Sequence, residues 1–405
     1  MSPVNTKKVG LQTALIHSDD AISKESDVSP AIHLSTTYDY DSDAEPIKWT
    51  ADKEYVYYSR IWNETTSRAE AAVSAIVNAN AVLYASGLAA IFALFTHLHP
   101  KRVAIHTPGT GGYGGVVRII DIMKRLSNTQ VLYIDENCEG IQKHDLIFLE
   151  SPINPSGECC DIAYYAKLAH SKGALLAVDS TLAPPPLQDP FTLGADYVVH
   201  SATKYLAGHS DVLAGIVATK DPKVAQELRF DRIHLGSILQ PVSSHTLLRS
   251  LRTFSLRIQQ HSKNGYAIAQ HLYRLSTDAE FAKSLGIDGT LVKKVHHDSL
   301  QTESFVRKTL VGGHVSCFSV VFRTPEIAKK FCTSLQFFHH ATSLGSVESL
   351  CEWRLMSDPN VNPSLVRLSI GIEDISDLIS DINRVLASVT SESKTSARGD
   401  EQYDN

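Results

Sequence analysis

The feature that most constrains the fold is an alternation, beginning near Thr65, of short apolar runs and longer amphipathic stretches. AVLY at 81–84 is followed by GLAAIFALF at 87–95, and RVAIH at 102–106 by GGVVRIIDIMKRL at 114–126. Apolar runs of four to seven residues separated by helical spacings are typical of βα units on a mostly parallel sheet that is covered on both faces. The pattern therefore predicts an α/β fold.

The pattern of apolar and amphipathic segments changes near Arg257. A long helical pattern is followed by the strand-like run HVSCFSVVF, a helix opened by Thr324-Pro325, the run LVRLSIG and a last amphipathic helix. Thr at the N-cap with Pro at the first helical position is a recognised helix start. The sequence thus predicts four parts, which are an N-terminal arm at 1–64, a large domain at 65–256, a smaller α/β domain at 257–390 and a disordered polar tail at 391–405.

Composition excludes several classes of function. The formal net charge is −6, whereas a nucleic-acid binder usually carries a basic face. The most apolar stretch, at 81–95, is shorter than the ~20 residues of a membrane span, and the N-terminus lacks a signal-peptide pattern. Six cysteines are too few for a disulfide scaffold, and the paired histidines lack metal-site spacing. We expect a cytosolic protein with no metal, membrane or nucleic-acid partner.

The segment from Val198 to Ala214, VVHSATKYLAGHSDVLA, contains the most informative residues. Lys204 follows an apolar run, and desolvation favours its neutral amine, a nucleophile able to form a Schiff base. A plain surface lysine is the simpler alternative. Ser201-x-x-Lys204 also fits the S-x-x-K of serine β-lactamases, but the S-D-N and K-T-G that accompany it there do not occur in this sequence.

Asp179 ends the buried run ALLAVD, where a carboxylate needs a partner or a cation. The protonated pyridine nitrogen of pyridoxal phosphate (PLP) would be such a cation. Ser86-Gly87-Leu88 follows another apolar run and opens a helix, an arrangement suited to a phosphate. The hydroxyls of Ser201 and Thr203 would complete that phosphate site.

The glycines at 109–114 offer a competing interpretation. Gly109-x-Gly111-x-x-Gly114 fits the dinucleotide-binding pattern G-x-G-x-x-G, and Asp135 ends the next apolar run. A dinucleotide-dependent oxidoreductase is therefore a remoter alternative, although it gives no role to Lys204. Otherwise this loop would present Tyr113 to a planar ring.

Taken together, these segments resemble the PLP-dependent enzymes of cysteine and methionine metabolism, which include cystathionine γ-synthase, γ-lyase and β-lyase. The resemblance runs from Tyr58 to about Asp381, and the segment around Lys204 is its most specific part. It implies fold type I, the aspartate aminotransferase type. A mostly parallel seven-stranded sheet and a smaller C-terminal α/β domain are then expected.

The resemblance also implies roles for individual residues. Lys204 would hold PLP covalently and move protons, and Tyr113 would stack on the ring and act as an acid or base. Tyr58 and Arg60 would reach the phosphate of a neighbouring subunit, which implies a homodimer with shared sites and usually a homotetramer. The remaining cofactor-binding residues would be Ser86, Gly87, Leu88, Asn154, Asp179, Thr181, Ser201 and Thr203, and the substrate-binding residues Arg118, Ser343 and Arg367.

Four positions depart from the family pattern, and they are Glu64, Gly111, Ser180 and Thr342. Thr342 replaces a common Glu near the distal end of the substrate, so it leaves reaction type open. The expected activity is β- or γ-elimination at a carbon–sulfur bond of a substrate such as cystathionine. The alternatives are γ-replacement on an O-acylhomoserine and a family member that has lost catalysis.

Overall fold

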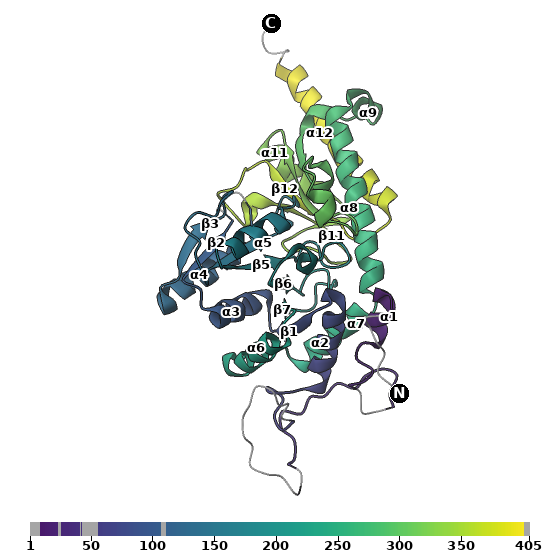
Figure 1. Ribbon diagram of the computed structural model, residues 1–405. Helices are drawn as coiled ribbons and strands as arrows, with labels where there is room; N and C mark the ends of the chain where they lie inside the picture. Colours follow the sequence, from purple (N-terminus) through teal and green to yellow (C-terminus); the bar gives the residue numbers. More distant parts are fainter. Residues whose placement is uncertain (1–8, 23–25, 41, 43–55, 107–110, 401–405) are drawn as a thin grey trace. The chain divides into compact units, whose positions relative to one another are not determined.

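The computed structural model describes residues 9–22, 26–40, 42, 56–106 and 111–400 (Figure 1). The chain divides into two compact units. The first contains Met1–Pro108, Tyr113–Ser151 and Asp161–Leu256, and the second contains Gly109–Gly112, Pro152–Cys160 and Arg257–Asn405. Two short segments that precede residue 161 thus belong to the second unit, which a sequence-based division at one position does not anticipate.

A seven-stranded sheet forms the centre of the first unit. Its strands are β1 (Asn80–Tyr84), β2 (Arg102–Ile105), β3 (Gln130–Tyr133), β4 (Leu146–Glu150), β5 (Leu175–Asp179), β6 (Tyr197–Ser201) and β7 (Gly215–Thr219). They lie in the order β1-β7-β6-β5-β4-β2-β3. β7 is antiparallel to both of its neighbours, and the other four pairs are parallel. The expected mostly parallel seven-stranded sheet is confirmed.

Helices cover this sheet. They are α2 (Glu64–Val77), α3 (Gly87–Leu98), α4 (Gly114–Ser127), α5 (Ile162–Ser171), α6 (Pro222–Leu235) and α7 (Pro241–Leu251). Apolar side chains of α3, α4 and α6 form one core cluster with alternate residues of the strands. Every residue of β4 and β7 is buried, as expected for strands covered on both faces.

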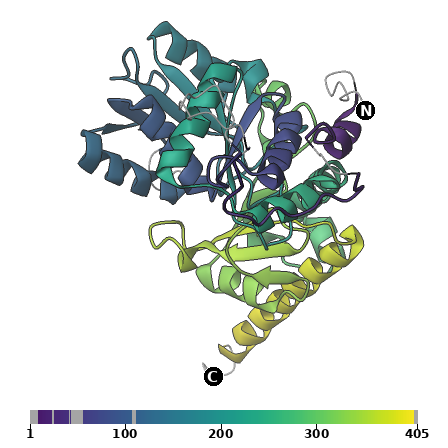
Figure 2. The same cartoon turned by 90° about the horizontal axis from the view of Figure 1, so that it is seen from below.

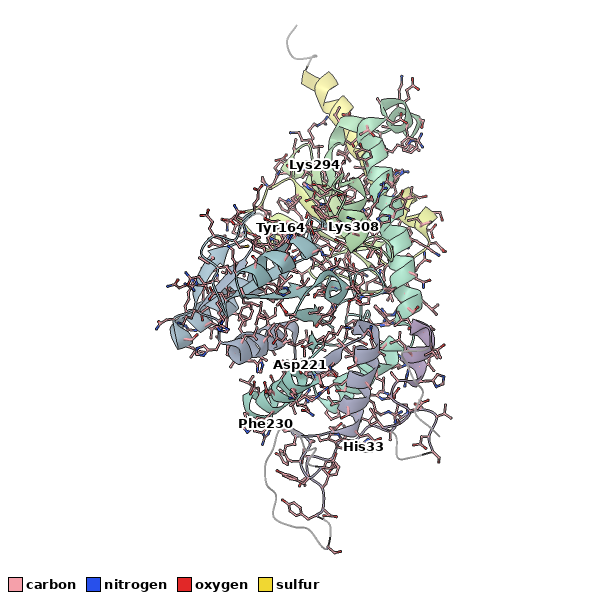
Figure 3. All side chains as sticks on the ribbon, viewed as in Figure 1. His33, Tyr164, Asp221, Phe230, Lys294 and Lys308 are labelled. Atoms are coloured by element: carbon pink, nitrogen blue, oxygen red, sulfur yellow. The ribbon has the colours of Figure 1, made fainter. Side chains whose placement is uncertain are left out.

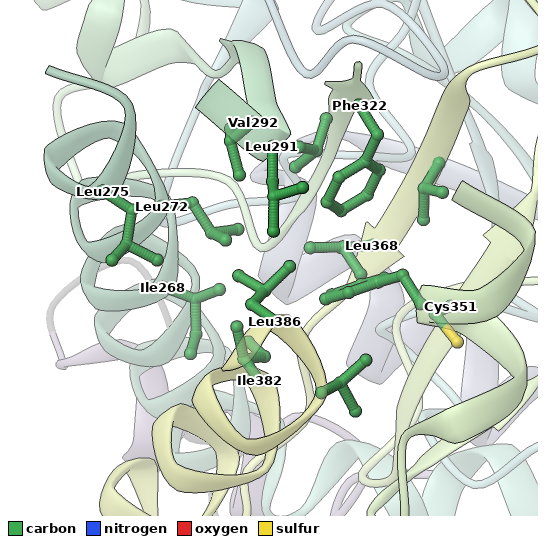
Figure 4. Close-up of a cluster of buried hydrophobic side chains, with 14 of the residues drawn as sticks. Ile268, Leu272, Leu275, Leu291, Val292, Phe322, Cys351, Leu368, Ile382 and Leu386 are labelled. Atoms are coloured by element: carbon green, nitrogen blue, oxygen red, sulfur yellow. The ribbon is translucent and has the colours of Figure 1, made fainter. Parts of the chain in front are cut away.

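The second unit contains a five-stranded sheet of order β10-β11-β12-β9-β8. Its strands are β8 (Val292–His296), β9 (Cys317–Phe322), β10 (Phe338–His340), β11 (Ser349–Trp353) and β12 (Leu365–Ser369). Its helices are α8 (Phe254–Thr277), α9 (Ala279–Ser284), α10 (Val306–Thr309), α11 (Pro325–Ser334) and α12 (Ile375–Asp400), and the first residues of α8 belong to the first unit. Figure 4 shows its core, where Ile268 and Leu272 of α8 pack with Ile382 and Leu386 of α12. The smaller α/β domain is confirmed.

Helix starts follow the capping residues of the sequence. The Thr324 hydroxyl accepts a hydrogen bond from the Ile327 N–H, so the predicted start of α11 is confirmed. Asp221 caps α6 in the same way, accepting from the Lys223 N–H (Figure 3). Such caps satisfy N–H groups that lack a partner within the helix.

The N-terminal arm contains a helix that the sequence did not predict, α1 (Leu11–His17). Ala14 and Leu15 are buried, and α1 packs against α2. The buried carboxylate of Asp19 lies 2.8 Å from Arg68 and 2.7 Å from Arg252, so it ties this part of the arm to α2 and to the end of α7. The seven residues of α1 are too few for the sequence to show a sustained helical period of apolar residues.

The sequence predicted a disordered tail at 391–405, and the structure describes residues 391–400 as the last turns of α12 (Ile375–Asp400). Figure 2 shows α12 as a long yellow helix. Val389 and Thr390 are buried, and Glu392 pairs with Lys330 of α11. A helix anchored in this way extends one residue at a time at little cost. Residues 401–405 lie outside the described part.

Among the described residues, no helix has the length and apolar character of a membrane span. Within the same ranges, no three His, Cys, Asp or Glu side chains gather as metal ligands.

Candidate active site

In the first unit, the candidate residues meet where the parallel strands end. Asp179 ends β5 and Ser201 ends β6, and Gly215, which opens antiparallel β7, pairs with both Ser201 and Tyr84. Ligand sites in open α/β sheets form at these carboxyl ends. The register therefore brings the turn after Tyr84 next to the segment that leads to Lys204.

That turn forms the start of α3. The Ser86 hydroxyl accepts from the Ala89 N–H at 3.1 Å, and Gly87 and Leu88 are the first two helical residues. Their N–H groups have no partner within the helix, which makes the position suited to an anion. A Cβ on Gly87 would lie 3.2 Å from the Cβ and Oγ of Ser201, so Gly87 leaves room for a small anion beside that hydroxyl.

Thr203 lies on the next turn. Its Oγ1 accepts from the Ala214 N–H at 3.1 Å and lies 3.3 Å from the Ala214 carbonyl oxygen. These contacts fix the hydroxyl near the start of β7. The predicted phosphate-binding residues of this unit thus come from two segments, 86–88 and 201–203, which the sheet holds side by side.

Asp179 is buried and hydrogen-bonded on one side. Its Oδ1 accepts from the Thr181 N–H at 3.0 Å and from the Thr181 hydroxyl at 2.6 Å. The Thr181 Oγ1 in turn accepts from the Ser201 N–H at 2.8 Å. Burial raises the pKa of Asp179, although the hydrogen bonds from Thr181 act in the opposite direction. A cation next to this carboxyl would remove the cost of its burial.

Lys204 lies in a turn that its backbone closes. Its N–H donates to the Ser201 carbonyl at 3.1 Å, and its own carbonyl accepts from the Gly208 N–H at 2.7 Å. Lys204 is half-buried, whereas Ala202, Tyr205 and Leu206 are fully buried. The predicted apolar setting of this lysine is present.

Tyr113 precedes α4 and is positioned by a residue that the sequence analysis missed. The Tyr113 N–H donates to Oε2 of Glu150 at 2.7 Å, and Glu150 ends β4 opposite Asp179. A Cβ on Gly115 would lie 2.5 Å from the Tyr113 ring, so this glycine allows the ring to lie against the start of α4. Glu150 could have been found by the argument used for Asp179, since it too ends a buried apolar run.

The second unit holds the remaining candidates. Arg367 on β12 donates from Nη1 to Asn154 Oδ1 at 3.0 Å and from Nη2 to the Ser343 carbonyl at 2.8 Å. Its Nη2 also lies 2.7 Å from Oε2 of Glu352, a residue that the sequence analysis did not single out. The three predicted residues of this unit therefore form one cluster around the Arg367 guanidinium.

Tyr58, Arg60 and Arg118 have other surroundings. Arg60 donates to the Ile233 carbonyl at 2.9 Å, and its guanidinium lies 5.4 Å from the centre of the Tyr58 ring. The side chain of Arg118 is 85% exposed and lies 3.7 Å from Asp121. The contacts of these three residues are thus with α6, with one another and within α4.

The four departures from the family pattern have definite places. Glu64 is the first residue of α2, which Asn63 caps, and Thr342 is exposed beside Ser343. The buried Ser180 hydroxyl donates to the Ala183 carbonyl at 2.9 Å, so it shapes the turn after Asp179.

The glycine loop of the competing interpretation is described only in part. Gly111 has φ +133°, and a Cβ there would lie 2.3 Å from Ile153, so backbone geometry alone requires a glycine. Gly114 is the first residue of α4, where a Cβ would meet nothing within 4 Å. Gly109 lies outside the described residues.

The donor set of the first unit fits PLP. The α3 start beside Ser201 suits a phosphate, the buried Asp179 suits a pyridinium nitrogen, and Lys204 supplies an amine. A dinucleotide cofactor, which the glycines at 109–114 suggested, would leave Asp179 and Lys204 without a role. Fold and site together define a PLP-dependent enzyme of fold type I.

Comparison with known proteins gives the family. The sequence profile described as "Cys/Met metabolism PLP-dependent enzyme" matches residues 12–387. Cystathionine beta-lyase of Lactococcus lactis subsp. cremoris (strain MG1363) is 32% identical over 93% of this chain and 98% of that protein. Cystathionine gamma-synthase of Escherichia coli (strain K12) is 33% identical over 88% of this chain and 92% of that protein. The chain belongs to the Cys/Met metabolism family of PLP-dependent enzymes.

Solved structures agree with this assignment. The crystal structure of metB from Corynebacterium glutamicum has a TM-score of 0.84 at 32% identity, over 95% of this chain and 100% of that chain. Cystathionine gamma-lyase from Lactobacillus plantarum, complexed with L-serine, has a TM-score of 0.80 at 29% identity, over 94% of this chain and 99% of that chain.

Proposed function

We propose that this enzyme cleaves a carbon–sulfur bond of a sulfur amino acid such as cystathionine, by β- or γ-elimination. The observation that carries the proposal is the grouping of Lys204, Asp179 and the start of α3 at one edge of the sheet, in a chain of the Cys/Met metabolism family. The relatives named above include both a lyase and a synthase at nearly equal identity. γ-Replacement on an O-acylhomoserine therefore remains the second reaction to assay.

The residues of the chain divide the chemistry among them. When bound, PLP supplies an aldehyde and an electron-withdrawing ring. Asp179 would hold a proton on the ring nitrogen, and the N–H groups of Gly87 and Leu88 with the hydroxyls of Ser201 and Thr203 would bind the phosphate.

Three further residues would act on the substrate. The Lys204 amine would move the proton on and off Cα. Arg367 would bind the α-carboxylate through charge-assisted hydrogen bonds, and Asn154 and Ser343 hold its guanidinium in place. Tyr113, whose backbone Glu150 anchors, would stack on the ring and exchange protons with the leaving group.

We extend the proposal to assembly and location. Tyr58 is 40% exposed next to Arg60, which is consistent with a role for both residues in the site of a neighbouring subunit. We therefore propose a homodimer with shared sites, assembled into a homotetramer in the cytoplasm, with Arg118 as an added contact to the substrate.

Replacement of Lys204 tests the proposal. The purified protein should be yellow, and borohydride reduction followed by peptide mapping should place the pyridoxyl group on Lys204. Lys204→Ala should lower turnover at least about a thousandfold, the scale of general acid–base catalysis, and should still bind PLP. Lys223→Ala, at an exposed position of α6, is the matched control and should keep full activity.

The products identify the reaction. With cystathionine, pyruvate indicates β-elimination and 2-oxobutyrate indicates γ-elimination, whereas formation of cystathionine from cysteine and an O-acylhomoserine indicates γ-replacement. A fully active Lys204→Ala variant would contradict the mechanism. A protein that binds PLP and turns over none of these substrates would support the loss of catalysis instead.

A further inference from the structure

A buried carboxylate contacts the arginine that we assign to the substrate carboxylate. Glu352 on β11 is the cross-strand partner of Arg367 on β12, and both residues are buried. Directly opposite positions of an antiparallel pair bring their side chains together on the same face. The 2.7 Å contact between Glu352 Oε2 and Arg367 Nη2 follows from this register.

A second arginine reaches the same oxygen. Arg354 lies two residues after Glu352, and its Nη1 donates to Glu352 Oε2 at 2.9 Å. The Arg354 side chain is 15% exposed, against 3% for Glu352 and 6% for Arg367. Two positive charges therefore share one carboxylate, and the cluster keeps one uncompensated positive charge.

Stability alone does not explain this cluster. Buried ion pairs often stabilise a protein no more than apolar residues of the same volume would. Within the described part of the chain, Glu352 Oε1 and Arg354 Nε are buried without a hydrogen-bond partner. Burying these three charged groups costs desolvation free energy and leaves two of their polar atoms without a hydrogen bond, which points to a role in binding.

We propose that Arg354 is a positioning residue that neutralises Glu352 and so leaves the charge of Arg367 for the α-carboxylate of the substrate. Glu352 orients the Arg367 guanidinium, but by itself it would cancel the charge of Arg367. With Arg354 present, the net charge of the cluster is +1 and matches a single carboxylate. This inference rests on the proposed role of Arg367.

The test compares two ligands on the PLP-loaded enzyme. L-Alanine carries the α-carboxylate without a leaving group, and ethylamine is the same molecule without the carboxylate. Each is titrated while the absorbance of the cofactor is recorded, so the readout is affinity and not turnover. The variants are Arg354→Met, Arg354→Lys, Glu352→Gln and the double variant Arg354→Met/Glu352→Gln. Arg323→Met is the matched control, because Arg323 pairs with Asp288 elsewhere in the same unit.

The expected result follows from the charge of the cluster. Arg354→Met leaves a neutral pair and should bind L-alanine about tenfold more weakly, the effect of one unit charge acting over roughly 12 Å at an effective dielectric constant of about 20. Ethylamine binding should not change. Arg354→Lys and the double variant restore a charge of +1 and should recover most of the affinity for L-alanine. Glu352→Gln alone should bind L-alanine at least as tightly as the wild type.

Two results would overturn the inference. Either Arg354→Met binds L-alanine like the wild type, or the double variant binds it no better than Arg354→Met. If Arg354→Met weakens both ligands equally, the role of Arg354 is structural and the inference fails as well. Failure of the proposed function looks different, since the wild-type protein itself would then show no spectral response to L-alanine.

Discussion

At the residue scale, Asp179 is placed for the cofactor at a cost to the cofactor-free protein. Burial raises the pKa of its carboxyl, so the charged form is disfavoured in the folded state. A group of this kind contributes its full stability below its pKa in the unfolded chain, near 3.9. That stability is lost as the pH rises through the higher folded-state pKa.

Asp179→Asn should therefore separate stability from cofactor binding. Asn keeps an oxygen that can accept from Thr181 and carries no charge. The cofactor-free variant should melt at or above the wild-type temperature at pH 7, and this difference should shrink towards pH 4. Its affinity for PLP should fall at least about tenfold, which is about 1.4 kcal/mol, since the charge interaction between this carboxylate and the ring nitrogen is lost.

Calorimetry of the cofactor-free proteins and absorbance titration with PLP measure the two effects. Asp121→Asn changes an exposed carboxylate and is the control. A cofactor-free Asp179→Asn protein that is less stable at pH 7 than at pH 4, relative to the wild type, would contradict this account.

Sequence reasoning identified the candidate site residues of the first unit, but it missed the residues that hold site residues in place. Lys204, Asp179 and Gly87 each stand at the end of an apolar run, and the structure places them at the same edge of the sheet. Glu150 was within reach of the same argument. Glu352 was not, because its importance comes from a register with Arg367, 15 residues away, that composition does not reveal.

At the scale of the elements, the start of α3 depends on a glycine in another strand. A Cβ on Gly215 of β7 would lie 2.0 Å from the Ser86 carbonyl oxygen and 2.7 Å from the Gly87 nitrogen. Both atoms belong to the backbone, so the clash cannot be relieved by a rotamer change. β7 and the proposed phosphate site therefore fit together only with glycine at this position.

Gly215→Ala should displace the start of α3. We expect a loss of stability of about 1–3 kcal/mol, the usual cost of overpacking, together with weaker binding of PLP. Gly114→Ala is the control, since a Cβ there meets nothing within 4 Å and Gly is a poor helix former. Thermal unfolding and PLP titration give both quantities.

The same control addresses the competing interpretation of the glycine loop only together with a second variant. Gly114→Ala alone does not separate PLP from a dinucleotide, because the third glycine of the dinucleotide fingerprint can be alanine. Combined with Lys204→Ala it does, since a dinucleotide-dependent enzyme gives no role to the Lys204 amine and should keep its activity without it, whereas a PLP-dependent enzyme should lose it. Gly111→Ala would be uninformative, because its φ of +133° and its contact with Ile153 disfavour alanine whatever the ligand.

Elements with strong local signals were predictable, and those held by tertiary contacts were not. The apolar runs from AVLY to GIVAT became β1 to β7, and Thr324-Pro325 began α11. The short helix α1 forms because Asp19 and Leu15 are tied to other segments, and the last turns of α12 continue from a packed helix. Neither cause is visible in a local window of sequence.

At the scale of the whole molecule, each unit buries a histidine away from water. Burial lowers the pKa to about 4 for His200 in the first unit and for His261 in the second. Unfolded histidine titrates near 6.5. The unfolded chain therefore binds protons first as the pH falls, and stability that is complete above pH 6.5 is lost towards pH 4.

The midpoint of thermal unfolding should therefore fall between pH 6.5 and 4, and His200→Phe should flatten this dependence. The difference between the folded-state pKa of His200, about 4, and the unfolded value corresponds to roughly 3 kcal/mol of stability, because one pKa unit is worth about 1.4 kcal/mol. Calorimetry across this range measures it, with His339→Phe at an exposed position as the control. An unchanged slope in His200→Phe would show that His200 does not cause the acid sensitivity.

The strand order of the first unit could not be predicted from the sequence. This order also determines how long one strand waits for its partner while the chain is being synthesised. Within the described sheet β1 pairs only with β7, and Thr219 follows Tyr84 by 135 residues. At about 5–20 residues per second, β1 waits roughly 7 to 27 seconds on the ribosome for its partner. Its apolar residues and open backbone edge are a template for aggregation throughout that interval. The antiparallel strand that completes the catalytic edge of the sheet thus makes the nascent chain a natural client for chaperones.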